Sequence, residues 1–317
     1  MLALSTFNIP TMKPTKIDLR DYRLSGAGAN GESYDCISDP EMMVKLYFPS
    51  YPVQPIFDEQ EVAVKVYGLG IPSPEPGEIV TDGSRLGIRF RRIRGKRSFS
   101  RMFADEPGRT EEFAREMARF CKRLHAVECP DGMFPDAKQQ FRDMLAQLKG
   151  ITEEERSFLA GLIDGMPDGK SALHGDMHFG NIITTLPEGA PLSDPHETYF
   201  IDLGYFAQGH PLLDLGMMAN ICIYSDADFV LREMHIHPDQ ARRVFDFFMD
   251  EYFFSEDRIA DKWFGPGQTM ETIMGSLRRS YCVKSILVCF NIGAPLPEFL
   301  DELRALMSED RNYSATR

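Results

Sequence analysis

The chain has 317 residues, of which 43% are hydrophobic and 26% charged, a composition typical of a soluble globular protein and unlike that of a disordered, collagen-like or coiled-coil chain. This length suggests two domains, or one domain divided into two lobes. The net charge of −13 argues against a protein that binds the phosphate backbone of nucleic acid. The acidity belongs to the C-terminal part, since residues 1–97 carry 13 basic and 12 acidic residues and residues 98–317 carry 22 and 36.

The cysteines and the hydropathy pattern indicate a cytoplasmic protein. The six cysteines form no C-x-x-C pair and have no zinc-like spacing with histidines, so we expect neither a metal cluster nor a disulfide framework. No basic segment followed by an apolar run opens the sequence, and its apolar stretches are shorter than the ~18 residues of a membrane span. We therefore expect no membrane partner.

The first hundred residues predict a small sheet with one helix. Short β-like runs occur at residues 42–47 and 86–90, separated by turn residues. Between Phe57 and Leu69 the apolar residues fall at helical spacing, and a Gly-Ile-Pro sequence at residues 70–72 closes that segment.

From Thr110 onward the apolar period changes to that of helices, as in residues 113–124, 244–248 and 273–281. This part is predicted to be mostly helical. It is interrupted near residues 182–186 and 198–201, which read as two strands joined by a loop that contains Pro, Gly and Ser.

Three oxygen-bearing side chains converge on that predicted hairpin. Residues 174–181 read His-Gly-Asp-Met-His-Phe-Gly-Asn and lead into it, and Asp202 follows its returning strand. Any one of Asp176, Asn181 and Asp202 could merely cap a turn. Together they are the set that Mg²⁺-assisted phosphoryl transfer requires, with one carboxylate to accept a hydroxyl proton and two hard oxygen ligands for the metal.

A G-x-G-x-x-G pattern at Gly26, Gly28 and Gly31 lies in the β-rich segment. It does not open a helix, so a dinucleotide-binding turn is poorly supported, and a flap over nucleotide phosphates fits better. Lys45 follows on a predicted strand, where it could bind the phosphates. Glu59 lies on the inward face of the predicted helix, whereas Glu61 should face solvent.

These motifs resemble those of the aminoglycoside phosphotransferase and choline kinase family, which shares the bilobal fold of protein kinases. The resemblance covers residues 25–216 and implies an α+β fold, with residues 1–94 as a nucleotide-binding N-terminal lobe and residues 95–317 as a larger, mostly helical catalytic and substrate-binding lobe. It also implies roles for the residues already named: Asp176 as the catalytic base, Asn181 and Asp202 as Mg²⁺ ligands, Lys45 as the phosphate-binding lysine and Glu59 as its ion-pair partner.

Two further segments match the family. Leu124 and His125 fit the helix that precedes the catalytic loop, and Asp214 matches an aspartate that braces this loop. Arg92 and Ile93, where the last strand of the N-terminal lobe runs into the linker, are expected to contact adenine through their backbone.

The sequence departs from the protein-kinase pattern in ways that point to a small acceptor. Position 175 is Gly where many protein kinases have Arg, no Ala-Pro-Glu follows Asp202, and only eight residues separate Gly204 from Leu213. A long activation loop has no room there. The expected function is ATP- and Mg²⁺-dependent transfer of the γ-phosphoryl group to a hydroxyl of a small molecule.

Other functions fit less of the sequence. One is a nucleotide-binding pseudokinase that transfers no phosphate, and another is an enzyme of the same fold that transfers AMP to protein. The acceptor itself is not specified, and aminoglycosides, amino alcohols, sugars and nucleosides remain open. The charge of the C-terminal lobe leads us to expect a cationic acceptor.

Overall fold

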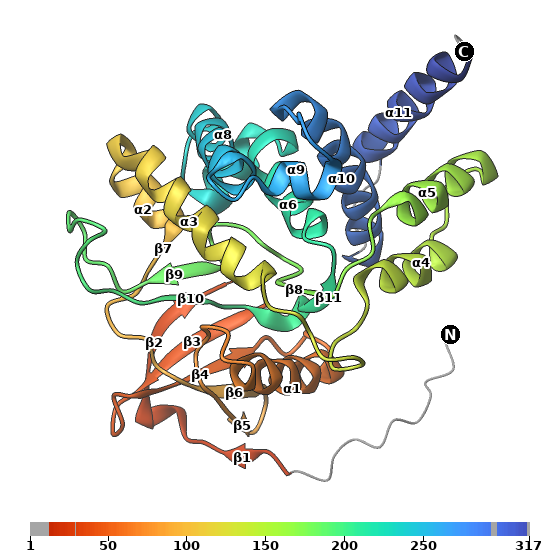
Figure 1. Ribbon diagram of the computed structural model, residues 1–317. Coiled ribbons are helices and arrows are strands. Elements are labelled where there is room, and N and C mark those ends of the chain that lie inside the picture. Colours follow the sequence, from red (N-terminus) through yellow and green to blue (C-terminus); the bar gives the residue numbers. More distant parts are fainter. Residues whose placement is uncertain (1–12, 29, 293–296, 316–317) are drawn as a thin grey trace. The chain divides into compact units, whose positions relative to one another are not determined.

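Residues 13–28, 30–292 and 297–315 are described by a computed structural model, in which the chain divides into two units, 1–94 and 95–317 (Figure 1).

The N-terminal unit contains a six-stranded sheet in the order β1-β5-β6-β4-β3-β2. All neighbouring strands are antiparallel except β1 and β5. The strands are β1 (Thr15–Lys16), β2 (Tyr22–Ala27), β3 (Gly31–Cys36), β4 (Met42–Tyr47), β5 (Pro76–Thr81) and β6 (Leu86–Arg91), and a short 3-10 helix (Leu19–Asp21) precedes β2.

The alternation of side chains along β4 assigns its residues to two faces. Val44 and Leu46 are buried with Val80 on one face. Tyr47 packs on the other face against Ile56, a residue of helix α1 (Val53–Gly68). Because side chains two residues apart point to the same face of a strand, Lys45 shares the α1 face with Tyr47.

Helix α1 begins at Val53, four residues before the predicted start at Phe57. Pro55 discourages a helix prediction, yet it lies in the first turn, where its missing N–H has no intrahelical acceptor to lose. The buried face of the helix includes Glu59, as predicted. Glu61 lies on the exposed side and forms an ion pair with Lys65 at 2.7 Å.

The second unit is mostly helical. Its helices are α2 (Phe99–Asp105), α3 (Thr110–His125), α4 (Ala137–Gln147), α5 (Glu153–Gly165), α6 (Leu212–Ala219), α7 (Ala227–Phe229), α8 (Pro238–Phe254), α9 (Ile259–Phe264), α10 (Met270–Ile292) and α11 (Pro297–Ala315). Short 3-10 segments occur at Pro107–Arg109 and Leu203–Tyr205, and π-helical ones at Asn220–Tyr224 and Val230–Met234. The predicted helical period of apolar residues is confirmed in α3, where Phe113, Met117 and Phe120 are all buried.

Five short strands accompany these helices: β7 (Arg97–Ser98), β8 (Ser171–Leu173), β9 (Ile182–Thr184), β10 (Thr198–Phe200) and β11 (Ala207–Gly209). The predicted hairpin is β9 and β10, which pair in antiparallel fashion with Phe200 opposite Ile182. Strands β8 and β11 also pair, and the sequence did not predict β11. Three residues are too few to show a strand period.

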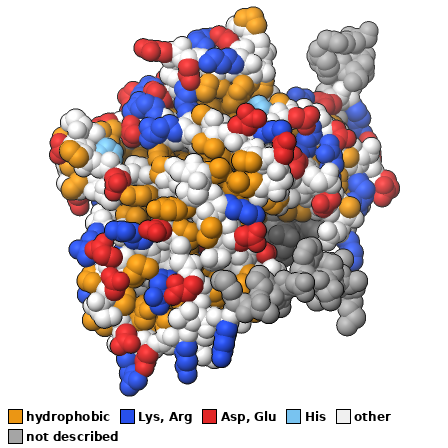
Figure 2. Space-filling model, turned by 60° about the horizontal axis from the view of Figure 1, so that its bottom comes forward, with side chains coloured by type: hydrophobic (Ala, Val, Ile, Leu, Met, Phe, Trp, Pro, Cys, Tyr) orange, Lys and Arg blue, Asp and Glu red, His pale blue; other side chains and the backbone are white. Residues whose placement is uncertain are grey.

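The predicted fold class is confirmed: a β-rich unit with one α-helix, followed by a larger unit of mainly helices. In residues 13–28, 30–292 and 297–315, no helix has both the length and the apolar character needed to cross a bilayer. Figure 2 shows a face of the molecule on which acidic and basic side chains are interspersed among hydrophobic ones.

Candidate active site

The 174–181 loop connects β8 to β9, and Asp202 follows β10. The antiparallel pairing of β9 and β10 brings the end of this loop next to the end of β10. The backbone N–H of Ile201 donates to the carbonyl of Asn181 at 3.0 Å. Asn181 and Asp202 therefore lie at the same end of the hairpin.

Asp176 and Asn181 are in direct contact. The Asn181 Nδ2 donates to the carbonyl oxygen of Asp176 at 3.0 Å and to its Oδ2 at 3.1 Å. Because both bonds use the amide nitrogen, the side-chain oxygen of Asn181 faces away from Asp176. This oxygen is the atom with which Asn181 could bind a cation.

His174 connects the two ends of the site and is itself fully buried. Its Nε2 lies 2.9 Å from the carbonyl of Ile201, which can only accept, so the proton is on Nε2. Its Nδ1 accepts the N–H of Asp176 at 3.3 Å. Burial lowers the pKa of His174, which agrees with a neutral ring that links the backbone before Asp202 to that of Asp176.

Asp214, on the first turn of α6, holds the start of the loop. Its Oδ2 accepts the N–H of His174 at 2.7 Å, and its Oδ1 accepts the N–H of Gly175 at 2.9 Å. Burial would raise the pKa of Asp214, but the hydrogen bond from His125 and the charge on Lys284 outweigh burial and lower it. The bracing role implied by the family resemblance is thus seen in the geometry.

Two further side chains continue this buried chain of contacts. The Nε2 of His125, the last residue of α3, lies 3.2 Å from Asp214 Oδ2. The Nδ1 of the same ring lies 2.6 Å from the hydroxyl of Tyr252 on α8. With the carboxylate accepting from Nε2, the tyrosine hydroxyl donates to Nδ1. Tyr252 was not predicted as part of the site, because it lies more than 70 residues from the loop.

Gly175 occupies a backbone position that excludes other residues. Its φ is +79°, and a Cβ built there would lie 1.8 Å from the carbonyl oxygen of Tyr205. Side chains are disfavoured at such φ angles even without the contact. The departure from the protein-kinase pattern at this position therefore has a local steric cause.

The charge environment keeps Asp176 ionised. Burial would raise the pKa of its carboxyl group, but the side chains of His178 and Lys284 outweigh burial and hold the pKa below its ordinary value. His178 Nε2 lies 3.7 Å from Asp176 Oδ2. Lys284, on α10, was missed by the sequence reading, and its only signal there is a lone charge in the apolar run 281–287.

Asp202 is exposed and adopts a left-handed backbone conformation, with φ 58° and ψ 60°. Only a few non-glycine residues do so, although Asp tolerates this conformation better than most. The part of the chain that the structure describes gathers no cluster of three or more His, Cys, Asp or Glu side chains for a metal. Asn181 and Asp202 fit Mg²⁺ better than a metal held by protein alone, because Mg²⁺ is commonly bound by one or two protein oxygens together with phosphates and water.

In the N-terminal unit, Lys45 and Glu59 form the ion pair that the sequence predicted. The Lys45 Nζ lies 2.9 Å from Glu59 Oε1, and the two side chains are 19% and 8% exposed. The pair joins β4 to α1 on their shared face. It presents the lysine at a fixed position.

The glycine pattern spans the hairpin between β2 and β3, with Ala29 outside the described residues. Gly31 is required by the sheet itself, since a Cβ there would lie 2.2 Å from the carbonyl oxygen of Leu46. A Cβ at Gly28 would meet nothing within 4 Å, and one at Gly26 would only touch Ser33. Gly26 and Gly28 therefore border open space, whereas Gly31 has a structural role.

At the end of β6, the backbone N–H of Arg92 donates to the carbonyl of Glu41 at 2.7 Å, and its guanidinium pairs with Asp35 at 2.8 Å. Within the described residues, the N–H of Ile93 donates to no acceptor. Of the two residues predicted to contact adenine, Ile93 thus has the backbone donor to offer. Arg92 retains only its carbonyl.

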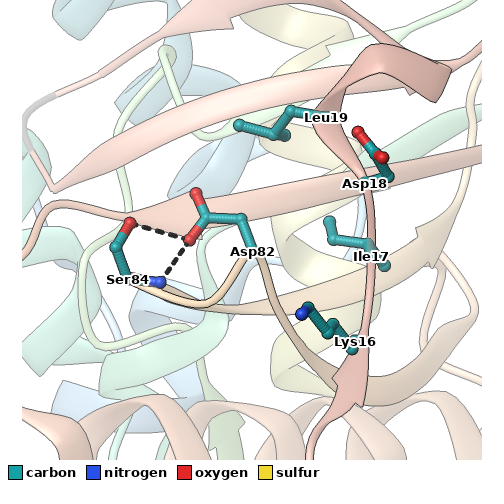
Figure 3. Close-up of a pocket in the computed structure, with 6 residues that line it drawn as sticks. All are labelled: Lys16, Ile17, Asp18, Leu19, Asp82 and Ser84. Carbon is teal, nitrogen blue, oxygen red and sulfur yellow. Dashed lines mark hydrogen bonds between the residues drawn. The ribbon is translucent and has the colours of Figure 1, made fainter.

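The N-terminal unit also has an open hollow of about 640 Å³, shown in Figure 3. None of the predicted site residues lines it. Its carboxylates are already engaged, since Asp82 accepts from Ser84 and Arg85, and Asp18 accepts from Arg20. Lys16 is the remaining charged side chain of this lining, and within the described residues it pairs with no carboxylate.

A family model described as the phosphotransferase enzyme family matches residues 21–248. The chain belongs to this family. Among curated proteins, none matches the chain significantly.

Several solved structures are similar to the chain at low identity. One is an aminoglycoside-3'-phosphotransferase of type VIII, with 19% identity over 89% of this chain and 93% of that chain and a TM-score of 0.49. Another is a choline/ethanolamine kinase family protein from Mesorhizobium loti, with 15% identity over 92% and 87% of the two chains and a TM-score of 0.49. The amicoumacin kinase hAmiN, in complex with AMP-PNP, Ca²⁺ and Ami, has 11% identity over 93% and 89% and a TM-score of 0.48.

Proposed function

We propose that this phosphotransferase moves the γ-phosphoryl group of ATP, in the presence of Mg²⁺, to a hydroxyl group of a small molecule. The observation that supports this most directly is the contact between Asp176 and Asn181 at the same end of the hairpin that carries Asp202. This arrangement offers a carboxylate for the acceptor hydroxyl beside two oxygen ligands for a metal.

Asp176 would bind the acceptor hydroxyl and receive its proton. The lowered pKa of this carboxyl group makes it a weak base, so it is ionised at neutral pH and accepts a hydrogen bond before it accepts a proton. A weak base suffices, because the transition state of phosphoryl transfer is loose and the nucleophile needs orientation more than early deprotonation. The main work of Asp176 is therefore to aim the hydroxyl oxygen.

Asn181 and Asp202 would hold Mg²⁺ through their side-chain oxygens. When bound, the metal neutralises charge on the phosphates. The orientation of Asn181 is set by its two bonds to Asp176, so the proposed metal ligand and the proposed base are fixed by the same contact. The remaining ligands would be phosphate oxygens and water.

The N-terminal unit would bind the nucleotide. Lys45, held by Glu59, would contact the phosphates, and the backbone at Gly26 and Gly28 would approach them. The free N–H of Ile93 would donate to the adenine ring, and the carbonyl of Arg92 would accept from its amino group. Gly31 would shape this hairpin without touching the nucleotide.

The test is a screen of hydroxylated metabolites and aminoglycosides for acceptor-dependent release of ADP, with mass spectrometry of the product. A phosphorylated acceptor, formed by the parent protein and slower by about 10² to 10⁴-fold with Asp176→Asn, is the expected result. AMP attached to protein would replace this proposal with AMP transfer. Tight ATP binding with no product from any acceptor would leave a nucleotide-binding module.

A further inference from the structure

Lys284 is a buried lysine with mostly apolar neighbours along its helix. It lies on α10 with 6% of its surface exposed, and its neighbours Val283, Ile286 and Leu287 are fully buried. An ammonium group loses its hydration in such a place, and an apolar side chain of similar length would suit the fold better. The position of this charge therefore calls for a reason beyond packing.

The contacts of Lys284 lie at the proposed catalytic loop. Its Nζ donates to the carbonyl oxygen of Gly175 at 2.6 Å. Within the described residues it forms no ion pair with a carboxylate. Its charge nevertheless acts on both Asp176 and Asp214, the residue that carries the proposed chemistry and the residue that braces the loop.

The peptide group that Lys284 holds is the one that carries Asp176. Its carbonyl, that of Gly175, accepts from Lys284, and its N–H, that of Asp176, donates to His174 Nδ1 at 3.3 Å. Gly175 has no side chain to restrict rotation about its backbone bonds, so this peptide group could turn if it were not held. A turn of the peptide would redirect the side chain of Asp176.

We propose that Lys284 is a positioning residue for phosphoryl transfer: through the carbonyl of Gly175 it fixes the peptide before Asp176 and so aims the Asp176 carboxylate at the acceptor hydroxyl. This inference rests on the proposed function for its catalytic part. It assigns helix α10, which contains no motif of the family, a direct role in the geometry of the site.

The experiment compares Lys284→Met with Arg279→Met. Both substitutions remove one positive charge from α10, but Arg279 is half exposed and pairs with Asp310 rather than with the loop. Lys284→Met should lower kcat by about 10- to 100-fold, because misplacing a reacting group by about 1 Å has an effect of this size. The KM values for ATP and for the acceptor should stay within about threefold, since Lys284 touches neither. Arg279→Met should match the parent.

A second readout does not depend on activity. Hydrogen exchange of the amides in the 174–181 loop should become faster in Lys284→Met and not in Arg279→Met, because the peptide before Asp176 has lost one of its two anchors. Faster exchange in a protein whose parent transfers no phosphate would contradict the proposed function while supporting the anchoring of the loop. Unchanged exchange together with parental kcat would overturn the inference.

Should Lys284→Met fail to fold, Lys284→Gln provides the same test. Its amide keeps a donor but is shorter and uncharged, so it cannot reproduce the 2.6 Å contact. A loss of kcat of at least about threefold with unchanged KM values supports the inference. Parental kcat in this variant refutes it.

Discussion

Asp214 Oδ1 accepts a hydrogen bond from the N–H of Gly175 at 2.9 Å, so the first turn of α6 fixes the backbone one residue before Asp176. The carboxylate that does this is fully buried and accepts two further bonds through its other oxygen. Three donors thus depend on one side chain.

Asp214→Asn should therefore destabilise the protein and inactivate it. The new amide group would place N–H donors against the N–H of either His174 or Gly175, and leaving buried donors unpaired costs about 2–4 kcal/mol of unfolding free energy. Urea unfolding followed by circular dichroism measures the loss. Asp164→Asn, at an exposed ion pair with Arg142, is the control and should change the unfolding free energy by less than about 0.5 kcal/mol. Equal midpoints for the two variants would contradict the bracing role.

Gly175→Ala should lower both stability and turnover. A Cβ at this position would lie 1.8 Å from the Tyr205 carbonyl oxygen, and φ +79° is strained for alanine, so the loop must move at a cost of about 1–3 kcal/mol. We expect kcat to fall by about 100-fold, because the loop carries Asp176. Gly161→Ala, in the middle of α5 with open space around its Cβ, should instead stabilise by about 0.5–1 kcal/mol. Thermal melts and kinetics of both variants decide the matter, and a Gly175→Ala variant with parental kcat would rule out the steric argument.

Lys45→Met should weaken ATP binding and turnover more than folding. The lysine is held by Glu59 on the α1 face, and a methionine there has no charge with which to bind the nucleotide phosphates. We expect the dissociation constant for MgATP, measured by calorimetry, to rise by about 10-fold or more. Lys65→Met removes a lysine from the exposed pair with Glu61 in the same unit and should leave binding unchanged. Parental affinity in Lys45→Met would place the phosphates elsewhere.

The parts of the fold that the sequence predicted are those with a clear local period. The apolar stripe of α3 and the β-like run of residues 42–47 in β4 were both readable. Strand β11 was not, because it has only three residues and depends on β8 for its hydrogen bonds. The start of α1 was placed too late because the apolar spacing becomes helical only from Phe57, whereas the helix already begins at Val53 and includes Pro55 in its first turn.

In the candidate site, too, local contacts could be predicted from the sequence and distant ones could not. Asp176 and Asn181 are five residues apart, so their contact could be inferred from spacing. The contact of Lys284 with Gly175 joins residues 109 positions apart, and the local sequence pattern of α10 does not indicate it. The occupied N–H of Arg92 is likewise a matter of tertiary pairing with Glu41. Distant partners of this kind require the structure.

The ring of His210 should titrate far below its ordinary range. Burial lowers its pKa to about 4, from 6.5, and its Nδ1 accepts the N–H of Leu212 at 3.3 Å, which requires that nitrogen to be unprotonated. The unfolded chain therefore binds this proton more readily than the folded chain, so stability should fall as pH decreases from 6.5 towards 4.

Trp263, the only tryptophan of the chain, reports this titration directly because its ring centroid lies 4.5 Å from that of His210. A protonated imidazole quenches a neighbouring indole, so fluorescence should drop with a midpoint near 4 while far-ultraviolet circular dichroism is still native. His210→Gln should lack the drop. A midpoint near 6.5 would show that the ring is open to water.

The acceptor should be cationic, because the unit that carries Asp176 is strongly acidic. Residues 98–317 contain 36 acidic and 22 basic residues, whereas the N-terminal residues are close to neutral. A surface with one dominant sign of charge attracts ions of the opposite sign and speeds their association. The value of kcat/KM for the best acceptor should therefore fall as ionic strength rises from about 0.01 M to 1 M and the Debye length shrinks from about 30 Å to 3 Å.

The alternative explanation is that the acidic residues only keep the protein in solution. A neutral acceptor of similar size is the control that separates the two explanations. Its kcat/KM should not depend on salt beyond the effect on MgATP, which is measured separately by varying the nucleotide. A flat salt profile for the best acceptor, or a best acceptor that is neutral or anionic, would exclude electrostatic attraction.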